Sequence, residues 1–368
     1  METPLTTLDE RQSLLIRAMR FPLIVLVVFA HSVGTFPTAT VEWSLDGWNV
    51  YHYISEMLSR HLFSIGTCWF FVFSGYLFFR YLKEEEFSFR WVTGKWKKRI
   101  RTLLIPFLIW NLLAVLATIL VNSLLALLSH GDVVEAIKSA LGRGPLEWFF
   151  TGPADFPLWF LRDLMLMSLI APLMYLLFRR FKYLTLALLF LIYLSPWNPW
   201  LPTMRSIFFF SIGVWLGTFK VNLIQLCRSV RIPALIAAIL LLLIATSQIG
   251  RPLHTFLLRL FYPFGMICFL NLCNLLIDDE RRRERLGSLS ASVFFIYAAH
   301  EIYILGWTKG LCLRIFGDSL AATWIRYWLV PVIVLVACLV LYFILNRLLP
   351  RTISFICGGR SKSPTLNK

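Results

Sequence analysis

The chain has 368 residues, of which 58% are hydrophobic and only 15% are charged, whereas a soluble domain carries about 25% charged residues. This composition excludes a soluble globular domain, because that much apolar surface has to be buried in lipid as well as in a core. The formal net charge of +16 would suit a nucleic-acid ligand, but Lys and Arg also accumulate in the cytoplasmic loops of membrane proteins.

Apolar runs of about 20 residues, the length that an α-helix needs to cross a bilayer, recur along the whole chain. They predict an all-α fold, a polytopic membrane helix bundle of about ten transmembrane helices. In chain order the expected spans are 18–36, 61–80, 103–128, 157–178, 183–195, 204–219, 232–249, 255–277, 288–307 and 326–348. They divide the chain into a cytoplasmic N-terminal segment (1–17), a transmembrane domain (18–348) and a basic cytoplasmic tail (349–368) that we expect to be disordered.

Lys and Arg gather in alternate loops of this arrangement: before the first span and after the second, fourth and eighth. The positive-inside rule places such loops in the cytoplasm, so both termini are predicted to be cytoplasmic. The opposite loops are poor in Lys and Arg and carry aromatic residues typical of a membrane interface: Trp43, Trp48, Tyr51, Tyr53, Trp148, Trp197 and Trp200. The basic charge is therefore explained by topology, and we expect no nucleic-acid partner.

The seven cysteines lie mostly inside apolar runs, where we interpret them as small hydrophobic side chains. None forms a Cys-x-x-Cys pair or a cluster with histidine. The sequence therefore indicates no metal site, and no permanently bound cofactor is expected.

The first span contains two ionisable residues, Arg20 and His31, with ten residues between them. At about 100° per residue both project from one helix face, roughly 16 Å apart along its axis. Charged side chains inside a span are costly and are candidates for function. The alternatives are that Arg20 extends to the lipid headgroups and that His31 makes a hydrogen bond between helices.

Two later spans also place ionisable groups in the outer half of the membrane. The fourth span begins near Pro157 and reaches Arg162 and Asp163, and the ninth carries His300 and Glu301. Arg162 and Asp163 could simply pair and hold helices together. The convergence of three helices nevertheless predicts a polar, substrate-filled cavity.

Several ordered motifs resemble the acyltransferase-3 group of membrane acyltransferases. They are the Arg20-x10-His31 pair, the second-span run Phe70–Phe79 with its Ser74-Gly75 step, the basic run Lys98-Arg99-Ile100-Arg101 before Pro106, the Pro157–Leu161 run and the Ser292–His300 run. They occur in family order, and the likeness extends from about residue 15 to 345. The basic run has Lys in place of the family's first Arg.

The resemblance implies transfer of an acyl group, commonly acetyl, from cytoplasmic acyl-CoA to a hydroxyl of a glycan or lipid-linked acceptor at the periplasmic side of a bacterial inner membrane. His31 would act as general base or as a covalent acyl relay, and Glu301 or Asp163 would orient its imidazole. The residues assigned to the site are His31, Glu301 and Asp163 for catalysis; Arg20, Arg99, Arg101 and Ser74 for binding the donor; and Arg162, Trp159, His300 and Arg60 for binding the acceptor substrate.

Two alternatives remain open from the sequence. A transporter or flippase for a glycan or small solute would also need intramembrane charge, although the absence of a convincing internal repeat argues against paired halves. A sensory or scaffold protein would use the buried charges only to hold its bundle together. Consumption of acyl-CoA would separate an enzyme from both.

Overall fold

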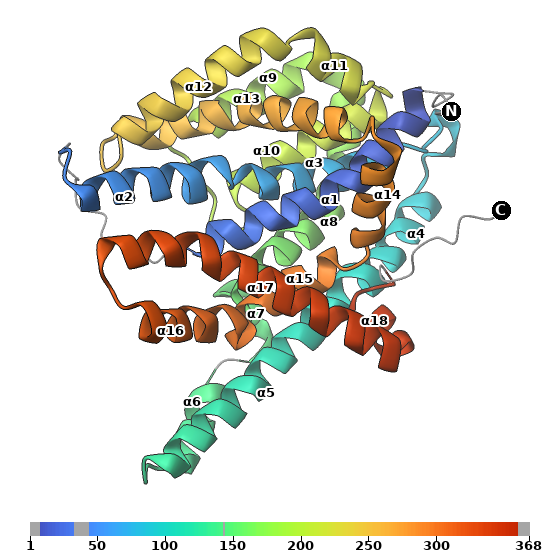
Figure 1. The fold of residues 1–368 in the computed structure, drawn as a ribbon. Coiled ribbons are helices and arrows are strands. Elements are labelled where there is room, and N and C mark those ends of the chain that lie inside the picture. Colours follow the sequence, from blue (N-terminus) through green and yellow to red (C-terminus); the bar gives the residue numbers. More distant parts are fainter. Residues whose placement is uncertain (1–7, 33–43, 143, 360–368) are drawn as a thin grey trace.

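The computed structural model describes residues 8–32, 44–142 and 144–359, and within these residues every regular element is a helix (Figure 1). In chain order the α-helices are α1 (Leu8–Ser32), α2 (Gly47–Glu56), α3 (Ile65–Phe79), α4 (Phe89–Arg99), α5 (Ile105–Leu128), α6 (Val133–Leu141), α7 (Pro145–Phe150), α8 (Trp159–Phe181), α9 (Tyr183–Leu194), α10 (Met204–Thr218), α11 (Leu223–Ser229), α12 (Arg231–Ser247), α13 (Leu253–Leu276), α14 (Glu280–Leu289), α15 (Val293–Ala299), α16 (Leu305–Phe316), α17 (Leu320–Leu348) and α18 (Pro350–Ile356). The π-helical segments η1 (Met57–Leu62), η3 (Ile100–Leu104) and η5 (His300–Ile304) and the 3₁₀ turns η2 (Glu84–Glu86) and η4 (Phe156–Leu158) lie between some of them.

Six helical segments of the described chain are long and apolar enough to cross a membrane, and the number rises to eight if each of two bent pairs counts as one span. The bent pairs are α10 with α11, at 112°, and α14 with the helical segment Val293–Phe316, at 46°. Helices α9 and α12 correspond to the expected spans 183–195 and 232–249, but both are shorter than these six segments. The multi-pass, all-helical fold is confirmed, whereas the count of about ten spans and the cytoplasmic termini stay predictions.

Part of an expected outer loop is helical. The aromatic residues Trp48, Tyr51 and Tyr53 lie in α2, which continues through η1 into α3 as one segment, Gly47–Phe79. Asp46 caps this helix, because its side chain accepts hydrogen bonds from the backbone nitrogens of Trp48 and Asn49. The ring of Tyr51 packs edge-on against Trp324 of α17, with ring centroids 5.0 Å apart. Tyr51 therefore serves helix packing, and the interfacial position of these residues stays a prediction.

The segment expected to be a disordered tail begins with an ordered helix, α18. The side chain of Ile353 is buried, and the backbone oxygen of Ile356 accepts a hydrogen bond of 3.1 Å from Trp110 Nε1 of α5. These contacts order residues 350–356, although the segment is short and basic. Residues 360–368 of the predicted tail lie outside the described residues.

Helices α3 and α10 cross at very close range because glycines face each other. A Cβ atom on Gly75 would lie 2.2 Å from the backbone oxygen of Phe210, and a Cβ on Gly213 would lie 2.1 Å from that of Val72. Small residues allow membrane helices to approach in this way. The glycine of the second-span motif thus fixes the position of the helix that also carries Ser74.

We expect Gly213→Ala to lower the free energy of unfolding by about 1–3 kcal/mol, because the added methyl group has to push α3 and α10 apart. Thermal unfolding of the detergent-purified protein, followed by circular dichroism, measures the effect. Gly94→Ala is the matched control, since no atom lies within 4 Å of a Cβ built at that position of α4. Equal unfolding midpoints for the two variants would contradict the close crossing.

The basic segments gather at one end of the bundle. The N-terminal half of α1, α4 and α14 lie at the same end in Figure 1, and Arg17 Nε donates to the backbone oxygen of Gly287 at 3.3 Å. At that end Arg11 also pairs with Asp278 at 2.5 Å. Helix α1 runs from this basic end into the bundle and places His31 in its last turn. We call these two extremes of α1 the basic end and the His31 end.

Candidate active site

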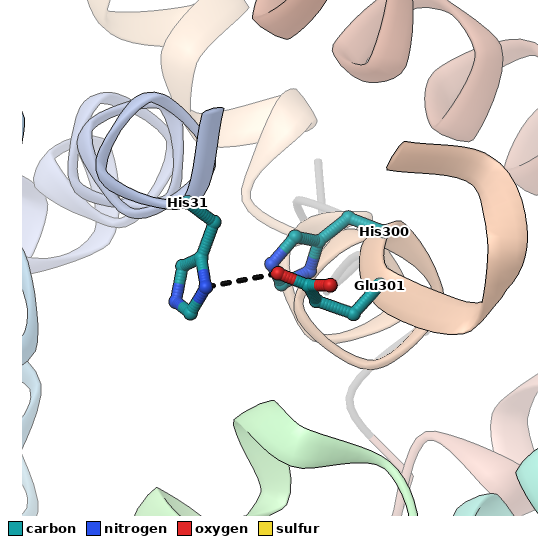
Figure 2. Close-up of side chains that lie close together, drawn as sticks. All are labelled: His31, His300 and Glu301. Atoms are coloured by element: carbon teal, nitrogen blue, oxygen red, sulfur yellow. Dashed lines mark ion pairs between the residues drawn. The ribbon is translucent and has the colours of Figure 1, made fainter. Parts of the chain in front are cut away.

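The core of the candidate site is the contact between His31 and Glu301, shown in Figure 2. Nδ1 of His31 lies 3.0 Å from Oε1 of Glu301. A carboxylate only accepts hydrogen bonds, so Nδ1 carries a proton, and in the neutral imidazole that a general base requires Nε2 keeps its lone pair. The side chain of His31 is 22% exposed and that of Glu301 is 27% exposed. Glu301 therefore orients the imidazole, which remains accessible from outside the protein. The arrangement is that of a general base whose tautomer is set by a carboxylate.

His300 completes the cluster from the buried side. Its ring centroid lies 5.3 Å from that of His31, and its Nδ1 lies 3.0 Å from the backbone oxygen of Ile296 and 2.9 Å from that of Tyr297. Because carbonyl oxygens only accept, Nδ1 is the protonated nitrogen and Nε2 is an acceptor. That Nε2 is buried and has no hydrogen-bond partner among the described residues.

A break in the ninth expected span places Glu301 opposite His31. The helix is interrupted in η5, where Ile302 has ψ 84° and Tyr303 has φ 61°. A positive φ is rare for a bulky side chain and stores backbone strain. On the far side of the break, Lys309 Nζ donates to the backbone oxygen of His31 at 2.8 Å, which holds the C-terminal end of α1 in position.

The same three side chains could also hold a metal ion, since ligand atoms of His31, His300 and Glu301 all lie within 4.8 Å of one another. Two imidazoles and a carboxylate are a common ligand set for zinc. The expectation from the sequence concerned the cysteines, and His31 comes close to His300 and Glu301 only in the fold. The expectation of no metal site therefore stays a prediction.

A cavity of about 270 Å³ extends along α1 and connects the His31 end with arginines near the basic end. It is lined by His31 and by Arg20, Ser74 and Arg99, which were all assigned from the sequence. Arg99 Nη2 donates to both the backbone oxygen and Oγ of Ser74 at 3.3 Å. Aromatic rings of Phe70, Trp159 and Phe160 form much of the remaining wall. We call this space the α1 cavity.

Asp163 does not orient His31. Its Oδ2 accepts hydrogen bonds of 2.9 Å from the backbone nitrogen and Oγ1 of Thr203 and from Oγ of Ser206. Its Oδ1 lies 3.4 Å from Arg162 Nη2. The carboxylate is fully buried and anchors the start of α10, so its geometry supports a structural role, and Glu301 is the carboxylate that meets His31.

The remaining assigned residues separate into two groups. Arg162 and Trp159 line a second cavity beside the first. Arg60 and Arg101 are exposed, and neither lines either of these cavities. Arg60 pairs with Glu56 at 3.3 Å, one helical turn away.

Asp155 is a buried acidic residue that the sequence analysis missed. Its backbone nitrogen donates to Asn111 Oδ1 at 3.3 Å, but neither of its carboxylate oxygens has a partner among the described residues. The neighbouring ring of Phe156 packs edge-on against His31, with centroids 5.9 Å apart. The sequence does show an acidic residue two positions before the Pro157–Leu161 motif, and this position could have identified Asp155.

The fold and the site together define a multi-pass membrane protein with a histidine–carboxylate pair at one end of an intramembrane cavity and arginines towards its other end. The family model of the acyltransferase domain of the acyltransferase-3 family matches residues 15–347. The chain therefore belongs to this family, as its motifs indicated, and is a membrane O-acyltransferase.

Among characterised relatives, the chain is similar to the succinoglycan biosynthesis protein ExoH of Rhizobium meliloti (strain 1021). The two are 29% identical over 373 residues, which cover 96% of this chain and 94% of the relative. No solved structure matches the chain.

Proposed function

We propose that the protein transfers an acyl group from cytoplasmic acyl-CoA to a hydroxyl of a glycan or lipid-linked acceptor. The expected acyl group is acetyl, and the acceptor lies at the periplasmic side of a bacterial inner membrane. The observation that carries the proposal is the His31–Glu301 pair at one end of the α1 cavity, with Arg20 and Arg99 lining it towards the basic end. The similar protein is a succinoglycan biosynthesis protein, and this supports a polysaccharide acceptor.

The donor enters from the basic end. Acyl-CoA carries its phosphates at the nucleotide and its thioester at the far end of a long, thin arm. Arginine binds phosphate bidentately and stays charged, so Arg99 and Arg20 suit the phosphates. Between Arg20 and His31 the helix rises by roughly 16 Å, and the aromatic walls of the cavity suit the largely uncharged arm.

The reaction uses the unprotonated Nε2 of His31. This nitrogen removes the proton of the acceptor hydroxyl while the oxygen attacks the thioester carbonyl carbon. The C–S bond breaks, the new ester forms, and the CoA thiolate leaves with the proton returned from the imidazolium. Glu301 stabilises the imidazolium through Nδ1–H. A relay uses the same geometry in two steps. Nε2 first attacks the thioester and takes the acyl group, while the C–S bond breaks and the CoA thiolate leaves. The acceptor hydroxyl then attacks the acyl carbon, and the N–C bond breaks to form the ester. The hydroxyl proton passes to the released Nε2 and from there to the thiolate.

Label transfer in membrane vesicles tests the function. Vesicles that contain the protein, with their cytoplasmic face outwards, are supplied with radiolabelled acetyl-CoA, and label is followed into the glycan and lipid fractions. We expect incorporation above that of vesicles without the protein. A transporter would move solute without consuming the thioester, so unchanged acyl-CoA across several donors would contradict the proposal.

We expect Arg99→Ala to raise the KM for acyl-CoA by roughly 10- to 100-fold, since charge-assisted hydrogen bonds contribute about 1.5–3 kcal/mol. The matched control is Arg90→Ala, which removes an exposed arginine of the same helix, α4, outside the α1 cavity. Initial rates at varied acyl-CoA in the vesicle assay measure both. If Arg90→Ala had the larger effect, the donor would not enter along the α1 cavity.

A further inference from the structure

A second cavity, of about 410 Å³, lies next to the His31 end and contains three arginines: Arg162 at the start of α8, Arg205 at the start of α10 and Arg259 in α13. Among the described residues, no acidic one lines it. Trp159 lines both this space and the α1 cavity. Phe156 lines it as well, and its ring packs against His31. We call this space the arginine cavity.

Only one of the three arginines is paired with a carboxylate. Arg162 lies 3.4 Å from Asp163 Oδ1. Arg205 Nη2 donates to the hydroxyl of Tyr262 at 3.1 Å, and its guanidinium lies 4.8 Å from the centre of that ring. Arg259 Nη1 donates to the backbone oxygen of Tyr193 at 2.8 Å, and also to that of Ser195. In the part of the chain that the structure describes, neither Arg205 nor Arg259 has an ion pair.

Two unpaired guanidinium groups inside a membrane protein are costly. Neutral partners satisfy some of their N–H groups but leave the charge, and the fixed fork of a guanidinium matches the two oxygens of a carboxylate or phosphate. The arginines converge on an aromatic-walled space, where an incoming anion would be held away from bulk water. The cavity is therefore built to receive a negative charge.

We infer that the arginine cavity binds an anionic group of the acceptor, a phosphate or a carboxylate, and thereby holds a neighbouring hydroxyl at His31. The inference rests on the proposed acyl transfer and adds the chemical class of the acceptor. Trp159 lines both cavities, and the ring of Phe156, which lines the arginine cavity, packs against His31, so an acceptor held by Arg205 and Arg259 lies next to the His31 end of the α1 cavity. Donor and acceptor then meet at Nε2.

Kinetics with paired acceptors test the inference within the transferase reaction. Each pair has one saccharide with and without its phosphate or carboxylate. We expect Arg205→Gln and Arg259→Gln to raise the KM for the anionic member about tenfold or more and to leave that for the neutral member nearly unchanged. Arg205→Lys should recover part of the loss, because it keeps the charge. Arg251→Gln, which removes an exposed arginine outside the cavity, is the control. Equal loss on neutral and anionic acceptors would overturn the inference.

Thermal unfolding tests the site independently of catalysis. Inorganic pyrophosphate and glucuronate are added separately to the detergent-purified full chain. We expect one of them to raise the unfolding midpoint of the native protein and of Arg251→Gln, but not that of Arg205→Gln. A response to pyrophosphate assigns a phosphate, and a response to glucuronate assigns a carboxylate. No response to either overturns the anion site, while protection without any acyl transfer would leave the site standing and remove the proposed function.

Discussion

His31→Ala is expected to lower the rate of acyl transfer by about 10²- to 10⁴-fold, the range that a positioned general base contributes. The substitution removes the nitrogen that accepts the hydroxyl proton and leaves Glu301 without its partner at 3.0 Å. His31 is at the C-terminal end of α1, with a side chain 22% exposed, so truncation should leave the bundle folded. The vesicle assay with radiolabelled acetyl-CoA measures the loss, and detergent chromatography of both forms checks the fold.

The matched control is His130→Ala, which removes an exposed histidine in the turn after α5. Equal labelling by the native protein and His31→Ala would remove His31 as catalyst and direct attention to His300 and Glu301. The assay also separates the two routes. With a poor acceptor, a relay accumulates label on the protein in the native form but not in His31→Ala, whereas direct transfer accumulates none in either.

The sequence predicted the elements of the site better than their contacts. Helix geometry alone places Arg20 and His31 on the same face of α1, and both residues line the α1 cavity. The choice between Glu301 and Asp163 as the partner of His31 could not be made in this way. Asp163 is held by Thr203 and Ser206 at 2.9 Å, some 40 residues away, and such a contact exists only once α8 and α10 have packed.

The break at Ile302 and Tyr303 had no sequence signal. Helix interruptions are normally expected at Pro or Gly, whereas the residues here are His300-Glu301-Ile302-Tyr303. The ninth span was therefore predicted as a continuous helix, 288–307. The structure shows a helix that ends before His300 and resumes at Leu305, and this interruption brings Glu301 towards α1.

Arg205 and Arg259 were missed for a related reason. Each lies near the end of an expected span, 204–219 or 255–277, where an arginine usually extends to the lipid headgroups. The two arginines converge on one cavity only because of how α10 and α13 pack, and this packing cannot be predicted from the apolar periodicity of the sequence. Residues that share a helix can be assigned together from sequence, whereas a cavity built from several helices has to be seen in the fold.

The second large effect is expected for Glu301→Gln, which should lower kcat for acyl transfer by about 10²-fold or more while changing the KM for acyl-CoA little. A glutamine amide can donate a hydrogen bond to Nδ1, which moves the imidazole proton to Nε2 and removes the base. It also lacks the charge that stabilises the imidazolium during transfer. In serine proteases, where an aspartate has the same relation to a histidine, the corresponding amide substitution costs about 10⁴-fold.

Glu301→Asp and Glu135→Gln separate a positioning role from a structural one. Aspartate keeps the charge and should retain more activity than glutamine, although its shorter side chain lengthens the contact with His31. Glu135 is an exposed residue of α6, so its substitution should leave the rate unchanged. Initial rates at saturating acetyl-CoA, together with unfolding midpoints in detergent, measure all three.

If Glu301→Gln kept native kcat, the carboxylate would not set the tautomer of His31. The unpaired Nε2 of His300 and the buried carboxylate of Asp155 would then be the next groups to test as the source of the base.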